Sequence, residues 1–399
     1  MFYCVYLKII KLIKENNDEI LINKNKRKRR KNKREYKKEK KNCIKKEDDV
    51  TVLIPTYNVG GCILETIKSI KTQKYCGDIF IKITDDGSTD KTVELLENEE
   101  LDDKFEVLKL KHLGKAGALN EGLKCVKTKY VITVDSDTIL HGLAIRKIMN
   151  KLQSLEQDIA ATAGSVFVKN PKKNLITKIQ ECDYTLGILG VKLLQGNYNS
   201  MLVAQGAFSA YRTDKFLEIE GWQDCVGENI VLTWKLLAKG YKTNFVEEAI
   251  AFTEVPETFK KLGKQRKRWA RGMIEAFKRV NPIKSNKIDI KSKILIFFNI
   301  FFPFIDLALL IFVPLSLVLF SMGNKLLVSW ISLLVIPLGL MLCILIEYKR
   351  KETFKKIDYI LEKRSKIAFI FYILIYAFIL APYCLIGYIS ELINLKRKW

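Results

Sequence analysis

The chain has 399 residues, with 68 Lys and Arg residues against 44 Asp and Glu residues, and a formal net charge of +24. Its apolar fraction of 48% suffices for a sizeable core and excludes a chain that is disordered throughout. The nine cysteines form no Cys-x-x-Cys pair and only two histidines occur, which argues against a zinc site or a disulfide framework and favours a reducing compartment.

The first region, residues 1–49, is predicted to be a basic tail. Its apolar start, residues 1–13, is too short to cross a bilayer and has no small-residue cleavage site. Between Lys24 and Lys46 there are 15 Lys and Arg residues and two acids. Such a run suits the anionic headgroups of membrane lipid. Few aromatic residues accompany it, so we expect no nucleic-acid partner.

Residues 50–280 alternate short β-rich runs with helix-like runs. Strands are predicted at Val50–Ile54, Ile79–Thr84, Phe105–Leu110 and Tyr130–Val134. Helices are predicted around Ile63 to Ile70, at Thr92–Glu99 and at Ala116–Val126. This alternation predicts an α/β fold whose mostly parallel sheet is covered on both faces. Sheets of this kind bind ligands at the carboxyl ends of their strands.

Polar clusters follow three of these strands where each strand ends: Thr56-Tyr57-Asn58, Asp85-Asp86 and Asp135-Ser136-Asp137. Two carboxylates two positions apart, beside a second acidic turn, offer the hard oxygen ligands that suit Mg²⁺ or Mn²⁺. The Gly-rich turn at 114–117 adds the positive charge of Lys115. The combination predicts a pocket for a nucleoside diphosphate.

The third region, residues 281–399, is mostly apolar. Three stretches are long enough to cross a bilayer: Ile294–Phe320, Leu326–Ile346 and Ile367–Ile389. Eight Lys and Arg residues in Tyr348–Lys366 predict that this segment, and the domain before Ile294, face the cytoplasm. Three spans would place the C-terminus outside, whereas Lys396-Arg397-Lys398 indicates the inside. Either one span is interfacial or re-entrant, or the tail breaks the rule.

Six motifs occur in order over about 220 residues, and they are Ile54-Pro55-Thr56-Tyr57-Asn58, Asp85-Asp86-Gly87-Ser88-Thr89-Asp90, Gly114-Lys115-Ala116-Gly117-Ala118-Leu119-Asn120, Asp135-Ser136-Asp137, Gly206-Ala207-Phe208-Ser209-Ala210-Tyr211-Arg212 and Gln265-Arg266-Lys267-Arg268-Trp269. Together they resemble the processive membrane glycosyltransferases of family 2, which have the GT-A fold and include cellulose, chitin, hyaluronan and poly-N-acetylglucosamine synthases. The last motif matches the family's QxxRW signature.

The resemblance implies a GT-A domain, followed by an α-helical transmembrane region, in a multi-pass protein of the cell membrane. It implies inverting transfer of a sugar, N-acetylglucosamine or glucose, from a UDP-sugar to a growing polysaccharide. The residues it assigns to the donor are Thr56, Tyr57, Asp86, Lys115, Asp135, Asp137, Gln265, Arg268 and Trp269. Phe208 and Trp269 are assigned to the acceptor, and Asp135 and Asp137 to Mg²⁺ or Mn²⁺.

One position departs from the family's pattern. The family has Glu-Asp ahead of an apolar helix, and its Asp is the general base, whereas this chain has Glu228-Asn229. An amide does not accept the proton of an acceptor hydroxyl, and general-base catalysis is worth roughly 10²–10⁴-fold. The chain is therefore an engineered trap, a natural variant of reduced activity, or an enzyme that recruits Glu228.

Three other functions remain open at this point. A non-processive transferase to a lipid-linked acceptor resembles the first four motifs but generally lacks QxxRW. A catalytically impaired donor-binding subunit would explain Asn229. A membrane-tethered nucleic-acid binder would leave the acidic turns unexplained. Because only a 13-residue apolar patch precedes residue 50, a complete channel is expected to need a second subunit or a homo-oligomer.

Overall fold

The computed structural model describes residues 47–98, 103–154, 158–281, 285–323, 326–361 and 364–396. Asp48–Gln73 and Asp78–Trp399 form one compact unit, and the elements below belong to it. The basic tail predicted at residues 1–49 lies, up to residue 46, outside the described residues. Cys76 is disulfide-bonded, which corrects the expectation of a chain without disulfides, whereas the other described cysteines are free thiols.

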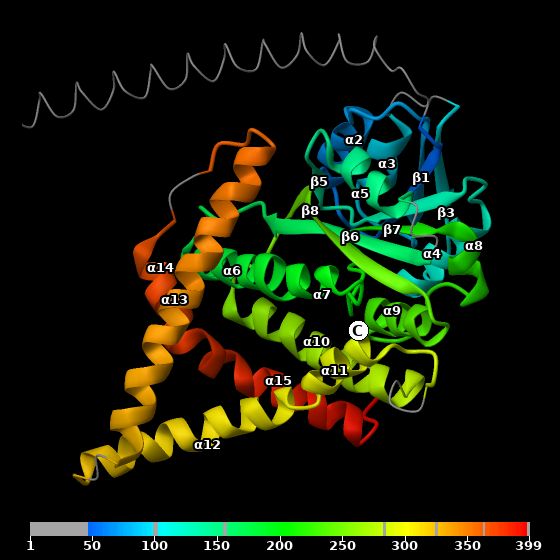
Figure 1. The fold of residues 1–399 in the computed structure, drawn as a ribbon. Helices are drawn as coiled ribbons and strands as arrows, with labels where there is room; N and C mark the ends of the chain where they lie inside the picture. Colours follow the sequence, from blue (N-terminus) through cyan, green and yellow to red (C-terminus); the bar gives the residue numbers. More distant parts are fainter. Residues whose placement is uncertain are drawn as a thin grey trace, which may run out of the picture. The chain divides into compact units, whose positions relative to one another are not determined.

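An eight-stranded sheet has the order β3-β2-β1-β4-β7-β6-β8-β5 (Figure 1). Its strands are β1 (Val50–Thr56), β2 (Ile79–Asp85), β3 (Phe105–Lys109), β4 (Tyr130–Val134), β5 (Ile139–Leu140), β6 (Ile159–Val168), β7 (Phe208–Arg212) and β8 (Lys242–Thr253). The first four are parallel, while β7 is antiparallel to both β4 and β6. The sheet is therefore mostly parallel, as predicted, and the carboxyl ends of β2, β1 and β4 lie next to one another.

Amphipathic helices connect and cover these strands. They are α2 (Cys62–Lys71), α3 (Thr92–Glu97), α4 (Gly114–Lys124), α5 (Ala144–Leu152), α6 (Leu175–Leu186), the π-helix η1 (Gly187–Lys192), α7 (Leu193–Asn197), α8 (Thr213–Glu218) and α9 (Glu228–Ala238). Helix α2 buries Ile63, Ile67 and Ile70, the residues whose spacing predicted it. Helix α4 approaches β1 closely, since a Cβ at Gly122 would lie 2.3 Å from the Leu53 side chain.

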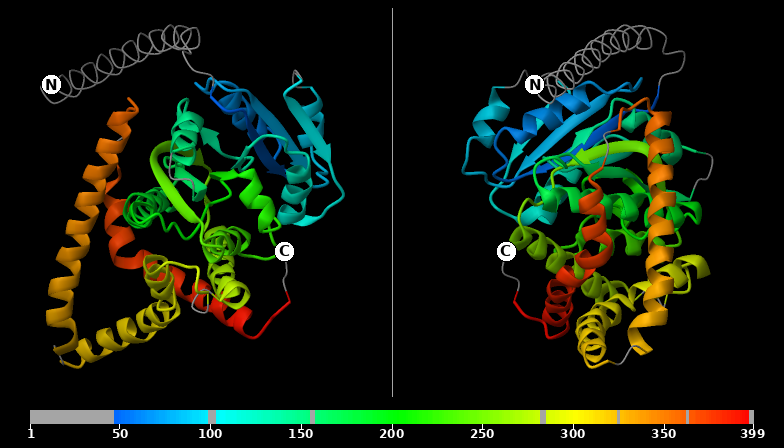
Figure 2. Two further views of the ribbon diagram at one scale, coloured as in Figure 1. Left: turned by 45° about the vertical axis from the view of Figure 1, so that its right-hand side comes forward. Right: turned by 90° about the vertical axis from the view of Figure 1, so that its left-hand side faces the viewer.

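Longer helices form the C-terminal part of the chain (Figure 2). They are α10 (Phe259–Val280), α11 (Ile290–Asn299), α12 (Phe302–Ser321), α13 (Leu326–Lys356), α14 (Lys366–Phe371), the π-helix η2 (Tyr372–Tyr376) and α15 (Ala377–Leu392). Among the described residues, two helical segments, Ile290–Ser321 and Lys366–Leu392, are long and apolar enough to cross a membrane. They contain the first and third predicted spans. The second predicted span is part of α13, and most of its side chains lie outside the described ones.

An acidic side chain occurs within the first of these segments. Asp306 of α12 accepts a hydrogen bond of 3.0 Å from the Tyr388 hydroxyl of α15. A polar group in an apolar helix is stabilised when it faces protein rather than lipid. Asp306 therefore links α12 to α15, as a helix-packing polar contact would.

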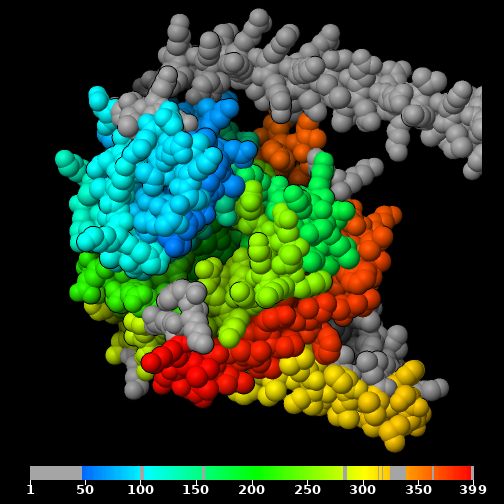
Figure 3. Space-filling model, turned by 180° about the vertical axis from the view of Figure 1, so that it is seen from behind, coloured from blue at the N-terminus to red at the C-terminus, as the bar shows by residue number. Residues whose placement is uncertain are grey.

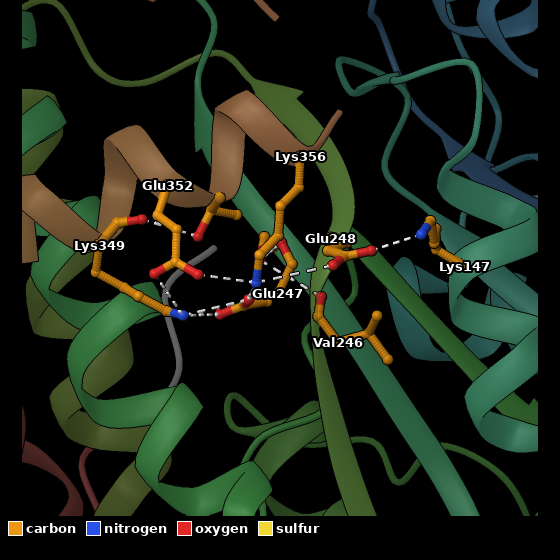
Figure 4. Close-up of polar contacts among 9 residues, drawn as sticks. Lys147, Val246, Glu247, Glu248, Lys349, Glu352 and Lys356 are labelled. Atoms are coloured by element: carbon orange, nitrogen blue, oxygen red, sulfur yellow. Dashed lines mark hydrogen bonds and ion pairs between the residues drawn. The ribbon is translucent and has the colours of Figure 1, made fainter. Parts of the chain in front are cut away.

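The end of α13 packs against a bulge of β8 (Figure 4). The pairing of β6 with β8 jumps from Val246 to Ile250, so Glu247 and Glu248 leave the regular ladder. Lys349 lies 3.1 Å and Lys356 2.9 Å from the Glu247 carboxylate. Next to these ion pairs Phe354 is 2% exposed, and its ring centroid lies 4.8 Å from that of Phe167. The basic segment after the second predicted span thus packs against the sheet domain through ion pairs and an aromatic contact.

Candidate active site

The acidic turn after β2 determines where α4 begins. One carboxylate oxygen of Asp86 accepts a hydrogen bond from the Leu113 N–H at 2.6 Å, and the other accepts one from the Gly114 N–H at 3.0 Å. The first N–H groups of a helix lack intrahelical partners, so a carboxylate at this place stabilises the helix start. Because of this cap, α4 begins at Gly114 rather than at Ala116, and Lys115 lies in its first turn.

An exposed aromatic surface lies beside Asp86. The ring centroids of Tyr57 and His112 are 4.8 Å apart with an interplanar angle of 35°, and Tyr57 is 48% exposed. His112 Nδ1 lies 2.9 Å from Asp86 Oδ2. Tyr57 belongs to a motif that the resemblance assigns to the donor, whereas none of the six motifs includes His112. The only available signal was its position just before the Gly114 turn.

Lys115 connects the two acidic motifs. Its ammonium lies 2.6 Å from Asp135 Oδ1, while the same helix start is capped by Asp86. A Cβ added to Gly206 would lie 3.2 Å from both Lys115 Nζ and Asn229 Nδ2, and 3.5 Å from Asp135 Oδ1. The end of β4, the start of α4 and the start of α9 therefore meet at the backbone of Gly206. The start of α4 thus connects the two acidic turns, with Asp86 bonded to its backbone and Asp135 to its Lys115 side chain.

Asp137 is held by two hydroxyl groups. Thr253 at the end of β8 donates a hydrogen bond of 3.0 Å to Asp137 Oδ1, and Thr138 donates one of 3.2 Å. Burial, and after it the negative charge of Asp135, raise the pKa of the Asp137 carboxyl. Two neighbouring carboxylates of this kind form a site that a divalent cation would stabilise. The described residues contain no group of three or more His, Cys, Asp or Glu side chains around a common point, so phosphate oxygens and water would supply the other ligands.

Glu228 and Asn229 stand at the start of α9. Asn229 Nδ2 donates a hydrogen bond of 3.0 Å to Glu228 Oε1, whereas Asn229 Oδ1 is buried and has no hydrogen-bond partner among the described residues. Burial raises the pKa of the Glu228 carboxyl, although the charges of Lys115 and Arg268 act against this shift. The orphaned amide oxygen can accept a hydrogen bond from a ligand, and Glu228 is the nearest carboxylate that can take up a proton.

Gly227 and Gly272, which sequence reasoning missed, allow α10 to pack directly against the start of α9. A Cβ at Gly227 would lie 2.4 Å from the carbonyl oxygen of Gly272, so the start of α9 lies directly on the α10 backbone. Glu275 of α10, 2% exposed, accepts a hydrogen bond of 2.7 Å from the Val226 N–H. A lone glycine before Glu228 and another within a helix give no sign in the sequence that they touch.

The QxxRW residues lie on α10 as their spacing predicts. Trp269 is 42% exposed, and the Arg266 guanidinium lies 4.1 Å from the centroid of its ring system. Gln265 Oε1 is buried and has no hydrogen-bond partner among the described residues. Arg268 is exposed, and its positive charge acts to lower the pKa of both Glu228 and Lys115. Figure 3 shows a hollow between the blue and cyan surface of the N-terminal strands and the yellow-green surface that includes α10.

Three predicted site residues are buried: Asp86, which is 4% exposed and has both carboxylate oxygens engaged by the start of α4, Phe208 and Thr56. Phe208, expected to contact the acceptor, is 0% exposed in β7, and its ring blocks any Cβ at Gly164 of β6. The side chain of Thr56 is 2% exposed, and its backbone carbonyl accepts a hydrogen bond of 2.8 Å from the Asp86 N–H. Phe208 thus has no free surface for a sugar, and Thr56 positions the Asp86 turn through its backbone.

A large cavity in the described part of the chain lies away from the acidic motifs. It has a volume of about 910 Å³ and lies between β5, the loop after β6, α6 and the end of α13. None of the predicted site residues lines it. Its aromatic wall is the cluster around Phe167 and Phe354, so this cavity belongs to the docking of α13 and not to the acidic motifs.

The comparisons with known proteins agree with this geometry. The sequence model of the family described as "Glycosyl transferase family 2" matches residues 51–219. The poly-beta-1,6-N-acetyl-D-glucosamine synthase of Staphylococcus aureus (strain MSSA476) is 30% identical over 227 residues, which are 56% of this chain and 54% of that protein. The synthase of the same name from Staphylococcus epidermidis is 29% identical over 247 residues, 61% of this chain and 59% of that protein. The chain thus spans just over half the length of these curated relatives.

A solved structure shows the same fold. The mannosyltransferase PcManGT from Pyrobaculum calidifontis, solved in complex with GDP-Man and Mn²⁺, superimposes with a TM-score of 0.58 at 17% identity, over 90% of this chain and 94% of that chain. At this identity the likeness concerns the fold alone. Taken together, these matches show that residues 51–219 match the model of glycosyl transferase family 2 and that the sheet domain has a GT-A-like fold.

Proposed function

We propose that the chain is a membrane-bound, inverting glycosyltransferase that transfers N-acetylglucosamine from its UDP-sugar to a growing polysaccharide. The observation that carries this proposal is the continuous contact from Asp86 through the start of α4 to Lys115 and Asp135. It brings a base-binding turn, a cation and the metal motif to one strand edge. Similarity to poly-N-acetylglucosamine synthases supports the choice of sugar, with glucose as the second candidate.

Asp135 and Asp137 would hold Mg²⁺ or Mn²⁺. The metal, when bound, supplies Lewis-acid stabilisation of the leaving diphosphate. Lys115 and Arg268, from the helices α4 and α10, would add positive charge near the same phosphates. Tyr57 beside His112 offers a flat surface to the uracil base.

The transfer itself is a single displacement. The acceptor hydroxyl oxygen forms a bond to the anomeric carbon, the bond from that carbon to the diphosphate oxygen breaks, and UDP leaves with the electron pair. The hydroxyl proton passes to a carboxylate, for which Glu228 is the candidate, since Asn229 cannot take it up. Asn229 Oδ1 would accept the hydrogen bond of the same hydroxyl before transfer. Trp269, with its exposed ring, would bind the acceptor sugar.

A membrane location fits two features. The segments Ile290–Ser321 and Lys366–Leu392 are long and apolar enough to span a bilayer. With Leu326–Ile346 as a further crossing between them, the basic segment Tyr348–Lys366 would return to the cytoplasmic side, where Lys349 and Lys356 pair with Glu247 of the sheet domain. We therefore place the protein in the cell membrane in contact with lipid, with its catalytic domain in the cytoplasm. A second subunit or a homo-oligomer would complete the channel. Mass measurement in mild detergent tests that assembly.

The experiment that tests the proposal is an assay of membranes that contain the chain with several UDP-sugars, with and without Mg²⁺ or Mn²⁺. We expect metal-dependent UDP release with UDP-N-acetylglucosamine and a polymeric product. A short product attached to lipid would favour a non-processive transferase to a lipid-linked acceptor. Calorimetry with UDP gives the second readout. No UDP binding in any metal condition would overturn the proposal.

One observation favours a second candidate, a catalytically impaired donor-binding subunit. By the resemblance Asn229 stands where the family has its general base, and its amide, which cannot take up a proton, donates a hydrogen bond to Glu228. Such a subunit would bind UDP and metal without releasing UDP from any donor. UDP release that appears only in the Asn229→Asp variant would support it.

A further inference from the structure

Arg266, the second residue of the QxxRW segment, makes contacts that the motif itself does not specify. Arg266 Nη2 lies 2.6 Å from Asp183 Oδ2 of α6. The same nitrogen donates to the Tyr376 hydroxyl at 3.3 Å, and this hydroxyl donates to Asp183 at 3.1 Å. The three polar groups thus form a closed triangle that fixes the orientation of the guanidinium.

This guanidinium covers one side of Trp269. Its central carbon lies 4.1 Å from the centroid of the indole, within the range of a cation–π contact. The Arg266 side chain is 12% exposed, whereas Trp269 keeps 42% of its surface open. One face of the indole is therefore covered by protein, and the rest is available to a ligand.

Each partner of Arg266 comes from a different part of the chain. Asp183 lies 83 positions before Arg266, in α6, and Tyr376 lies 110 positions after it, in the apolar segment Lys366–Leu392. Tyr376 ends the π-helix Tyr372–Tyr376, and π-helical turns often occur at functional sites. The orientation of the indole thus depends on a residue of a candidate membrane helix.

We propose that Arg266 is a positioning residue that fixes Trp269 for the acceptor sugar, with Asp183 and Tyr376 setting the orientation of its guanidinium. The inference rests on the proposed function, because the acceptor role of Trp269 belongs to that proposal. A planar guanidinium can stack on the indole and bind a carboxylate at the same time, whereas an ammonium is a point charge. Arginine is therefore required at this position, and lysine would keep only the ion pair.

The test measures binding, so that it does not depend on turnover. The purified full-length chain is titrated with UDP and Mn²⁺, and then, in their presence, with an oligosaccharide of N-acetylglucosamine. For Arg266→Gln we expect the oligosaccharide Kd to rise about threefold to tenfold, the range of one cation–π contact, while the UDP Kd stays within about twofold. Arg266→Lys should give an intermediate oligosaccharide Kd, and Tyr376→Phe a rise of about twofold to threefold.

Lys267→Gln is the matched control. It removes one positive charge from the next position of the same helix, and none of the described residues forms an ion pair with Lys267. We expect both Kd values to stay at those of the unmodified chain. A general loss of structure would instead weaken UDP and oligosaccharide binding together.

Each outcome decides one question. Unchanged oligosaccharide binding in both Arg266→Gln and Arg266→Lys would overturn this inference. If Arg266→Gln fails to fold, Arg266→Lys alone gives the result. Binding of UDP without any oligosaccharide would remove the acceptor role of Trp269 and this inference with it. Binding of neither ligand would overturn the proposed function itself.

Discussion

The two sides of the site are built in different ways. On the donor side, Asp85 and Asp86 are satisfied by hydrogen bonds from Ser88, Leu113 and Gly114, all within 28 positions of the acidic turn. On the acceptor side, contacts join residues much farther apart, such as Arg266 and Asp183, and the buried oxygens of Asn229 and Gln265 have no partner among the described residues. The acidic turn at Asp85 and Asp86 is satisfied within the protein, whereas the start of α9 and the QxxRW segment have buried polar groups that a ligand would complete.

The largest effect is expected on the donor side. Asp137→Asn removes one of the two carboxylates of the metal motif, so UDP release should fall at least about 100-fold. The measurement is UDP release over a range of Mn²⁺ concentrations. Asp103→Asn, in an exposed turn after α3, is the control and should leave the rate unchanged. If Asp137→Asn released UDP at a rate within about twofold of the unmodified chain, residues other than Asp137 would have to hold the metal.

The next effect concerns the start of α9. Asn229→Asp restores a proton acceptor beside Glu228, and UDP release should rise at least about tenfold, since a general base contributes roughly 10²–10⁴-fold. The UDP Kd should change little, because an amide and a carboxylate have similar shapes. Equal rates for the two chains would show that position 229 is not the base position.

The pH dependence of the chain as written should identify Glu228. Its pKa is raised by burial, so the rate should rise with pH along a limb that lies above the ordinary range of a glutamate, as the carboxyl loses its proton. A pH–rate profile measures this limb. Glu228→Gln should abolish both the limb and most of the activity. Carboxyl groups with a raised pKa titrate between about pH 4 and 8. A rate that does not change across this range would exclude Glu228 as the base.

The contact between α9 and α10 tests how tightly the acceptor side is packed. Gly227→Ala places a Cβ within 2.4 Å of the Gly272 carbonyl, so it should lower the free energy of unfolding by about 1–3 kcal/mol and displace Glu228 from α10. Thermal unfolding measures the first effect. Gly187→Ala is the control, because no atom lies within 4 Å of its added Cβ. Equal unfolding temperatures for the two variants would contradict the contact.

The smallest effect is expected behind the site, at Lys192. Its ammonium donates to the Val203 carbonyl at 3.1 Å and to Gln205, and burial lowers its pKa to about 7. The unfolded chain therefore binds more protons than the folded chain between pH 7 and about 10, so stability should rise with pH in this window. Lys192→Met should remove this pH dependence, which for one group is at most about 1.4 kcal/mol per pH unit, measured by denaturant unfolding at several pH values. The same slope in both chains would contradict the lowered pKa.

Sequence reasoning was most successful where a structure is local. Tyr130–Val134 forms a strand with the predicted bounds, because five apolar residues are followed directly by the polar Asp135. The strands that precede the acidic turns are parallel to β1 on its two sides, as the alternation of β and α runs predicted, so their carboxyl ends share one edge of the sheet. The start of α4 was misplaced by two residues, since the cap on Gly114 comes from Asp86, 28 positions earlier.

The contacts of the acceptor side could be predicted from the sequence only in part. The QxxRW spacing placed Gln265, Arg268 and Trp269 on one helix, but nothing in the sequence pairs Arg266 with Asp183 and Tyr376. Phe208 was assigned to the acceptor from its motif, whereas β7 is an antiparallel strand between β4 and β6 that buries this ring. Such contacts depend on how separate elements pack, and a linear pattern does not contain this information.

The docking of α13 determines how the catalytic domain can be produced without its apolar helices. Exposed ion pairs such as Lys356 with Glu247 contribute at most about 1 kcal/mol and weaken in salt, whereas burial of a phenylalanine contributes about 1.5–3 kcal/mol. A fragment that stops before residue 326 would lose Phe354 and leave Phe167 and Phe252 uncovered. Such a truncated protein should aggregate, and a soluble version should therefore keep residues 347–361, rejoined to the domain by a polar linker.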